Sequence, residues 1–158
     1  MAGSSTADAL PAFYFDLASP ECYLAAERIL AVVPVACEWT GVSALGLPGG
    51  AFGGWRCAQD REIELARVER EAAARGLQPV RWPAELPFDS HFAMRAATFA
   101  KQIGRAVAFA QAAFRQAYAG GRDLSDPDNV LIAGAACEMH PAALRKGAEL
   151  RSVGAALT

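Results

Sequence analysis

The alternation of hydrophobic and polar residues predicts a strand, a helix and a second strand near the start of the chain. Residues 13–17 (FYFDL) form a short, mainly aromatic run that suits a buried strand, and residues 35–39 (VACEW) form another. Between them, hydrophobic residues recur at helical spacing until Pro34 ends the pattern. This hydrophobic stripe consists of Cys22, Ala25, Ala26, Ile29 and Val33. The three elements make a βαβ unit, in which the strands run parallel and the crossover is right-handed.

Beyond this unit the pattern becomes helical. Residues 41–54 hold six glycines and one proline, which predicts a mobile loop. Ser90, Asp126 and His140 each stand where they would cap the start of a helix. The helical segments that we expect are residues 60–75, residues 90–103, residues 105–119 and two shorter helices that begin near residues 126 and 140.

The pattern predicts two strands and no third. We therefore expect a βαβ portion over residues 12–45, followed by a loop and a helical domain over residues 46–158. A two-stranded sheet is a poor core by itself. Either the helices bury both strands, or another copy of the chain supplies partners as in a homodimer, or the sequence stops short of its natural end.

Composition fits a globular domain and argues against several classes of function. Of the 158 residues, 53% are hydrophobic and 20% are charged, which allows a sizeable core. The formal charge of −2 provides no dominant basic face, so we expect no nucleic-acid partner. The hydrophobic runs are too short to span a membrane and the N-terminus lacks a signal-peptide pattern, so we expect a cytoplasmic protein. Its four widely spaced cysteines should then be free thiols.

The segment Ser19-Pro20-Glu21-Cys22 lies where the first strand meets the first helix. Ser19 suits the N-cap, and Pro20 suits the first helical position. A helix N-terminus stabilises an anion, and a thiolate held there has a lowered pKa. Serine in the first place of a C-x-x-C spacing cannot form a disulfide, but its hydroxyl can donate to the thiolate of a cofactor such as glutathione. Without further information, a simple helix cap explains the same residues.

Three other features have simpler explanations. Residues 137–140 (CEMH) have the spacing of half a zinc site, but no second pair lies nearby and His140 is explained as a helix cap, so we predict no metal site. Cys22 lies on the hydrophobic stripe, which fits an inert buried thiol or a residue beneath a reactive centre. Trp82 is a candidate for a cleft, with core packing as the alternative.

Three segments resemble one family. Residues 13–25 (FYFDLASPECYLA) resemble the opening of the DsbA-like thioredoxin superfamily. The closest branch holds the 2-hydroxychromene-2-carboxylate isomerases and kappa-class glutathione transferases, which read F-D-x-x-S-P-[YW]-x-[YW]-L. Residues 82–97 resemble the W-P…F-P-x-N/S segment of that branch, and residues 118–128 resemble its G-x-D-I-S-D pattern. The resemblance covers nearly the whole chain from Phe13 onward.

The resemblance implies an α/β fold: a thioredoxin-like βαβ unit with a large helical insertion. It implies that glutathione binds at the helix start, with Ser19 stabilising the thiolate. The sequence departs from the family at Glu21, where an aromatic residue is usual, and at Asp89, where asparagine is common. It also shows no match to the C-terminal half of the thioredoxin fold, which we expect to be missing. The residues that the resemblance assigns to glutathione and substrate binding are Pro20, Trp82, Pro87, Asp89 and Ser90.

Three hypotheses about function follow. The first is a glutathione-dependent isomerase or transferase that acts on a small aromatic or electrophilic molecule, with Ser19 and Cys22 as catalytic residues. The second is a thiol-disulfide oxidoreductase that works through Cys22. The third is a non-catalytic, truncated relative that binds a ligand or dimerises through exposed strand edges.

Overall fold

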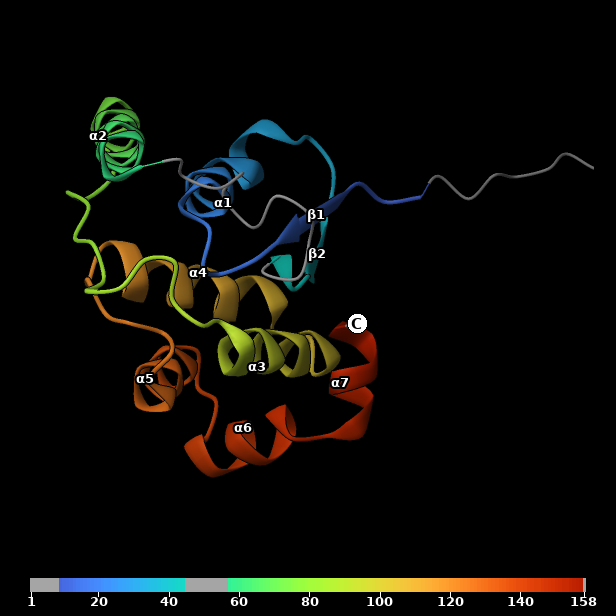
Figure 1. The fold of residues 1–158 in the computed structure, drawn as a ribbon. Helices are drawn as coiled ribbons and strands as arrows, with labels where there is room; N and C mark the ends of the chain where they lie inside the picture. Colours follow the sequence, from blue (N-terminus) through green and yellow to red (C-terminus); the bar gives the residue numbers. More distant parts are fainter. Residues whose placement is uncertain (1–8, 45–56, 158) are drawn as a thin grey trace, which may run out of the picture.

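The computed structural model describes residues 9–44 and 57–157, so most of the predicted glycine-rich loop lies outside it. Two strands and seven helices are found in these ranges (Figure 1). They are β1 (Ala12–Phe15), α1 (Pro20–Val32), β2 (Glu38–Gly41), α2 (Ala58–Ala74), α3 (His91–Gln102), α4 (Ala106–Tyr118), α5 (Pro127–Ala136), α6 (Pro141–Ala148) and α7 (Arg151–Leu157).

The βαβ unit is confirmed, because β1 and β2 pair in parallel on either side of α1. In this register Phe13 lies opposite Trp39. The predicted bounds of the second strand were wrong: β2 begins at Glu38, three residues later than expected. Its start is set by pairing with β1, where the Glu38 N–H donates to the Pro11 carbonyl at 2.8 Å. The described part of the chain contains no third strand.

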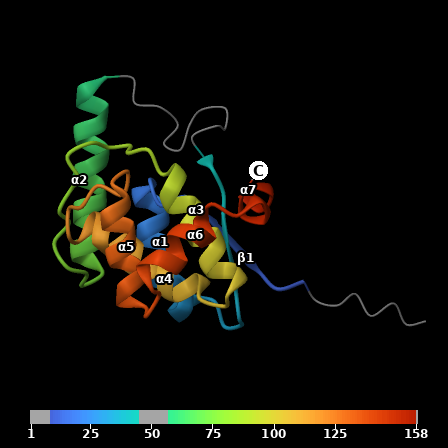
Figure 2. The same ribbon diagram turned by 90° about the horizontal axis from the view of Figure 1, so that it is seen from below.

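Helices α3 and α4 support one face of the sheet, and α5, α6 and α7 pack beneath them (Figures 1 and 2). Aromatic rings join the sheet to this helical layer. Phe15 of β1 packs against Trp39 of β2 and against Phe114 of α4, with ring centroids 6.1 and 5.8 Å apart. All three side chains are at most 2% exposed. The helices therefore bury one face of the small sheet, while Tyr14 and Glu38 stay exposed, so the first of our three alternatives is met only in part.

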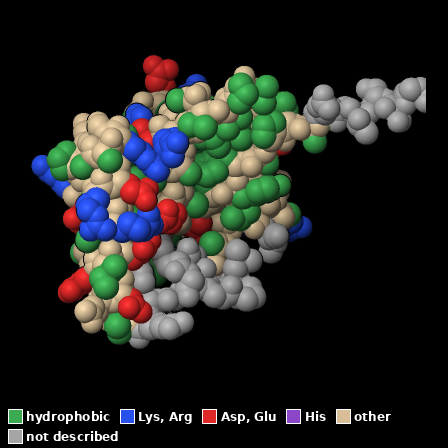
Figure 3. Space-filling view, turned by 90° about the horizontal axis from the view of Figure 1, so that it is seen from above, with side chains coloured by type: hydrophobic (Ala, Val, Ile, Leu, Met, Phe, Trp, Pro, Cys, Tyr) green, Lys and Arg blue, Asp and Glu red, His purple; other side chains and the backbone are tan. Residues whose placement is uncertain are grey.

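Helix α1 packs against α4 on one side and α2 on the other, which changes the expected buried face. Its most buried hydrophobic side chains are Tyr23, Leu24 and Ala26, whereas Cys22 of the predicted stripe is only partly buried. On the surface, charged and hydrophobic side chains lie over different elements (Figure 3). Charged side chains gather over α2, and hydrophobic ones gather beside β1.

Beyond the βαβ unit, the helix caps follow the sequence at two of three predicted positions. Asp126 accepts a hydrogen bond from the Asp128 N–H, and His140 accepts one from the Ala142 N–H. Ser90 stands at the start of α3, but its side chain makes no capping bond there.

Candidate functional site

Ser19 is the N-cap of α1, as its sequence position predicted. Its hydroxyl oxygen accepts a hydrogen bond from the Cys22 N–H at 3.2 Å, and its extended backbone begins the helix. Pro20 follows in the first helical position, where it has no N–H to satisfy. These two residues leave the Glu21 N–H as the unpaired donor of the first turn. The Ser19 hydroxyl hydrogen and this N–H are thus two donors at the helix start, although Ser19 itself is only 5% exposed.

Two distant helices hold the turn between β1 and α1 from below. The Leu17 N–H donates to the Met94 sulfur of α3 at 3.2 Å, and the Leu17 carbonyl accepts from the Tyr118 hydroxyl of α4 at 2.9 Å. Leu17 and Tyr118 are both 0% exposed. The backbone just before Ser19 is therefore fixed by buried contacts.

Asp16 provides a third attachment for the same turn. Its carboxylate is 1% exposed and accepts N–H hydrogen bonds from Ala18 and Ala44, both at 2.9 Å. Because Ala44 follows β2, this side chain joins the Ser19 turn to the end of the second strand. Burial raises the pKa of the Tyr118 hydroxyl well above its ordinary value, and the charges of Asp16 and Cys22 raise it further. The turn thus has a buried anionic group and a buried phenol beneath it.

Residues 82–88, which precede α3, pack against Tyr118, the tyrosine that holds the turn. The Trp82 ring meets the Tyr118 ring edge-on at 6.0 Å, and the Phe88 ring lies 6.4 Å from it. The Trp82 indole N–H donates to Glu69 of α2 at 2.6 Å. Trp82 therefore lies between α2 and the tyrosine that holds the turn, and it is only partly buried.

The remaining predicted ligand residues differ in exposure. Pro87 follows a cis peptide bond and is exposed, as is Asp89. Ser90 is 1% exposed, and its carbonyl accepts from the Met94 N–H at 2.7 Å. The Asp89 carboxylate accepts from the His91 N–H at 2.9 Å, so it satisfies the helix start that we had assigned to the Ser90 side chain. Among these residues, Ser90 is linked to the turn, because its partner Met94 also binds Leu17.

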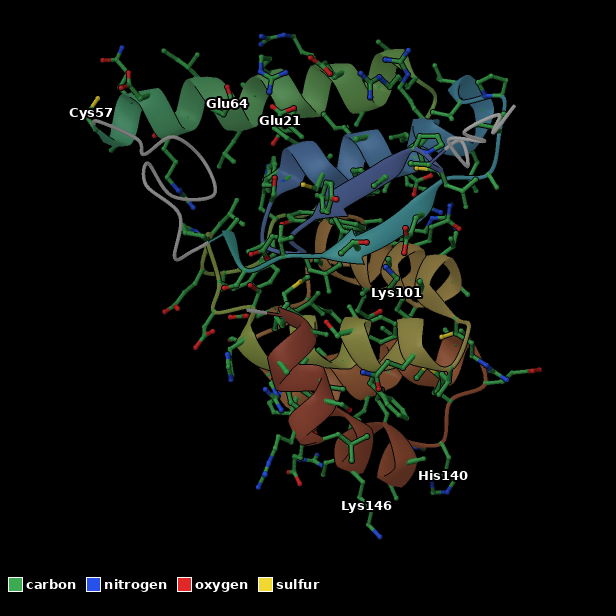
Figure 4. All side chains as sticks on the ribbon, turned by 90° about the vertical axis from the view of Figure 1, so that its right-hand side faces the viewer. Glu21, Cys57, Glu64, Lys101, His140 and Lys146 are labelled. Atoms are coloured by element: carbon green, nitrogen blue, oxygen red, sulfur yellow. The ribbon has the colours of Figure 1, made fainter. Side chains whose placement is uncertain are left out.

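Glu21 points away from the helix start toward α2. Its carboxylate forms an ion pair with Arg67, which also binds Glu64 and Glu71 of its own helix. Figure 4 shows Glu21 and Glu64 in the space between α1 and α2. In the sequence, Glu21 places a negative charge beside the proposed thiolate, where it would oppose ionisation. In the structure, the Glu21 carboxylate is paired with Arg67, a guanidinium that it shares with Glu64 and Glu71.

The half zinc site of the sequence is not assembled. The Cys137 thiol donates to carbonyls of the preceding turn, including Gly134 at 3.3 Å, and burial raises its pKa. His140 uses its Nδ1 atom in the cap of α6. Within residues 9–44 and 57–157, no three side chains of histidine, cysteine, aspartate or glutamate are grouped to hold a metal ion. No helix in these ranges has the length and hydrophobicity to cross a membrane.

Sequence reasoning missed three residues that position the turn: Asp16, Met94 and Tyr118. Asp16 carried a signal, because an acidic residue directly after an aromatic strand is either exposed or held by buried donors. Met94 and Tyr118 carried none, since each looks like an ordinary core residue on the hydrophobic face of a helix.

No protein-family model matches the chain, and no curated protein matches it significantly. Solved structures do resemble it. A 2-hydroxychromene-2-carboxylate isomerase (HCCA isomerase) has a TM-score of 0.72 and 16% identity, with 91% of this chain and 73% of that chain covered. A probable DsbA oxidoreductase from Streptomyces coelicolor has a TM-score of 0.67 and 20% identity, with 92% of this chain and 72% of that chain covered. The fold is therefore that of DsbA-like thioredoxin proteins with a helical insertion, as the sequence resemblance predicted.

Proposed function

We propose that the chain binds glutathione at the Ser19 turn and acts as a glutathione-dependent isomerase or transferase on small aromatic or electrophilic molecules. The observation that carries this proposal is the pair of donors at the start of α1. The Ser19 hydroxyl accepts from the Cys22 N–H, which leaves its own hydrogen as a donor, and the Glu21 N–H belongs to the same first turn. Such donors favour a thiolate over a thiol.

The residues present fit this ligand. Accepting from a backbone N–H polarises the Ser19 hydroxyl and makes it a better donor. The ion pair with Arg67 screens the Glu21 charge, which would otherwise oppose an anion at this place. Glutathione would supply a nucleophilic sulfur that adds to an electrophilic carbon and then either leaves, as in an isomerisation, or stays, as in a conjugation. The chain's own part is to hold the sulfur as an anion and to orient it.

One of the two solved structures of the same fold supports an enzyme of this kind. It is described as 2-hydroxychromene-2-carboxylate isomerase. The exposed Asp89 and Pro87 and the half-buried Trp82 are the side chains that we assign to the substrate side of the site, with Ser90 and Pro20 shaping its base. The four cysteines are free, which suits a reducing compartment, and we propose the cytoplasm.

The test separates the capping role of Ser19 from its role as a donor. Ser19→Asp keeps an acceptor for the Cys22 N–H but removes the hydroxyl donor and adds a negative charge. Ser19→Thr keeps both the acceptor and the donor. By calorimetry, we expect glutathione binding to weaken about 10- to 100-fold in the aspartate variant, because a hydrogen bond to a charged group contributes about 1.5–3 kcal/mol. The threonine variant should bind nearly as the wild type does.

Two controls make the result decisive. Ser152→Ala changes an exposed serine far along the chain and should bind glutathione normally. S-methylglutathione has no ionisable thiol, so it should bind the wild type and the aspartate variant with similar affinity. Equal binding of glutathione by the wild type and Ser19→Asp would show that the hydroxyl does not hold the sulfur.

A redox function through Cys22 is the second candidate, favoured by the likeness to a probable DsbA oxidoreductase. Cys22 is partly buried and Ser19 gives it no disulfide partner within the turn. Reduction of insulin by the wild type that disappears in Cys22→Ser would support this candidate. Reduction that survives the substitution would exclude Cys22 as the agent.

A further inference from the structure

A cleft of about 830 Å³ lies between α4 and α5. This volume is within the range of small-molecule sites, about 300–1,000 Å³. We call it the α4–α5 cleft and define its base by Ala108 and Ala112 of α4 and by Ile132, Ala133 and Ala136 of α5. In Figures 1 and 2, α5 lies on the opposite side of α3 from α7 and the C-terminus. The cleft shares no residue with the Ser19 turn.

The base of the cleft is hydrophobic, and most of its side chains are small. Ala108 and Ala112 are four residues apart on α4, as are Ile132 and Ala136 on α5, so each pair lies on one face of its helix. Ile132 is the one large side chain of the base and is 48% exposed. No aromatic side chain is among the described residues that line the cleft. The base therefore suits an aliphatic chain better than a ring that would stack.

Arg115 stands at one end of the cleft in a fixed orientation. Its Nε and Nη2 atoms donate to the two carboxylate oxygens of Glu27, at 2.7 and 3.0 Å. The Glu27 side chain is only 10% exposed, whereas that of Arg115 is 56% exposed. This ion pair does not use the Nη1 atom of Arg115. A guanidinium held in this way offers a directed, charged donor to a carboxylate.

Two amide side chains lie at the same end. Gln116 follows Arg115 on α4, and its Nε2 atom is buried with no hydrogen-bond partner in the described part of the chain. Gln78 lines both the α4–α5 cleft and an adjoining cavity that Arg115 and Glu27 also line. A buried N–H without an acceptor is unfavourable. An oxygen atom of a ligand would supply the acceptor that Gln116 lacks.

The charges differ between the two ends of the cleft. At the far end, Arg105 donates to the Cys137 carbonyl at the end of α5, and the exposed Glu138 also lines the cleft. A carboxylate and the C-terminal carbonyls of α5 therefore offset the charge of Arg105. Among the described residues that line the Arg115 end, none carries a carboxylate, since Glu27 lies in the adjoining cavity. An anionic group is thus favoured at the Arg115 end.

We propose that the α4–α5 cleft binds an aliphatic carboxylate. The carboxylate accepts from Arg115 and Gln116, and the chain lies over the alanines of the base toward Arg105. This assignment does not depend on the proposed function, because the cleft contains no residue of the Ser19 turn.

The first test asks whether the carboxylate is recognised. The probes are decanoate and 1-decanol, which have the same chain but differ in charge, and calorimetry on the 158-residue protein measures their binding. Because a hydrogen bond to a charged group is lost, we expect 1-decanol to bind about 10-fold or more weakly than decanoate. Gln116→Met replaces the amide by a hydrophobic side chain of similar length. It should weaken decanoate about 2- to 10-fold and leave 1-decanol unchanged.

A double variant tests the charge at the Arg115 end. Glu27→Gln combined with Arg115→Gln replaces the ion pair by two amides that can still bond to each other, so no buried charge is left unpaired. Its decanoate affinity should fall about 10- to 100-fold, while its affinity for 1-decanol stays that of the wild type.

The second test locates the bound chain. Ala136→Trp fills the cleft from an exposed position and should abolish decanoate binding. Ala135→Trp changes the neighbouring exposed residue, which does not line the cleft, and should bind as the wild type does. The proposal would be overturned if the wild type did not bind decanoate, if it bound decanoate and 1-decanol equally, or if decanoate binding survived Ala136→Trp.

Discussion

Replacing Tyr118 by phenylalanine tests how the turn that carries Ser19 is held. The hydroxyl is 0% exposed and donates to the Leu17 carbonyl at 2.9 Å. Its removal leaves that buried carbonyl without the donor, which costs about 1–3 kcal/mol of unfolding free energy. For a chain of this size, the melting temperature should fall by about 3–10 °C. Denaturant titration at about pH 7 measures the first quantity, and calorimetry measures the second.

The pH dependence of the unfolding free energy tests more sharply whether the Tyr118 hydroxyl is buried. The pKa of Tyr118 is raised in the folded state, mainly by burial and then by the Asp16 charge, above an ordinary value of about 10. Below about pH 10 both states keep the proton, so the hydroxyl's full contribution is present. Above about pH 10 the hydroxyl of the unfolded state loses its proton first. The unfolding free energy of the wild type should then fall by about 1.4 kcal/mol per pH unit because of this group.

Tyr118→Phe cannot lose a proton there, so its stability should fall less steeply. The difference in unfolding free energy between the wild type and Tyr118→Phe should therefore shrink by about 1–2 kcal/mol between about pH 10 and about pH 11.5. Tyr14→Phe removes the hydroxyl of an exposed ring and should change stability by no more than about 0.5 kcal/mol at pH 7. If this difference in unfolding free energy stayed constant through the alkaline range, the Tyr118 hydroxyl could not be buried and hydrogen-bonded as described.

Two further predictions concern charges at the site. Asp16→Asn leaves one of two buried N–H donors facing an amide N–H₂ group, so denaturant titration should show a loss of about 1–3 kcal/mol. Asp126→Asn, at an exposed cap where asparagine is equally good, should change stability by less than about 0.5 kcal/mol. Arg67→Ala frees the Glu21 charge and should weaken glutathione binding about 2- to 5-fold by calorimetry, because a half-exposed ion pair contributes at most about 1 kcal/mol. Adding Glu21→Gln should restore the affinity; failure to do so would show that Arg67 acts in another way.

The elements that the sequence predicted best are those with local signals. The starts of α1, α5 and α6 each combine a capping side chain with a proline in the first turn, and both features act within four residues. The second strand was misplaced because its start depends on which residues of β1 it faces, and that choice is made across the whole βαβ unit. The cap of α3 was misassigned because Asp89 and Ser90 are adjacent polar residues, and only the backbone path decides which one reaches the N–H groups.

In the candidate site too, features with local sequence signals could be predicted and features that depend on distant contacts could not. The position of Ser19 could be predicted from its neighbours, because an N-cap is defined by the turn that contains it. The contacts that fix the turn could not, since Leu17 binds Met94 across 77 residues and Tyr118 across 101. The direction of Glu21 was also hidden, because its partner Arg67 belongs to a helix whose packing on α1 no local pattern specifies.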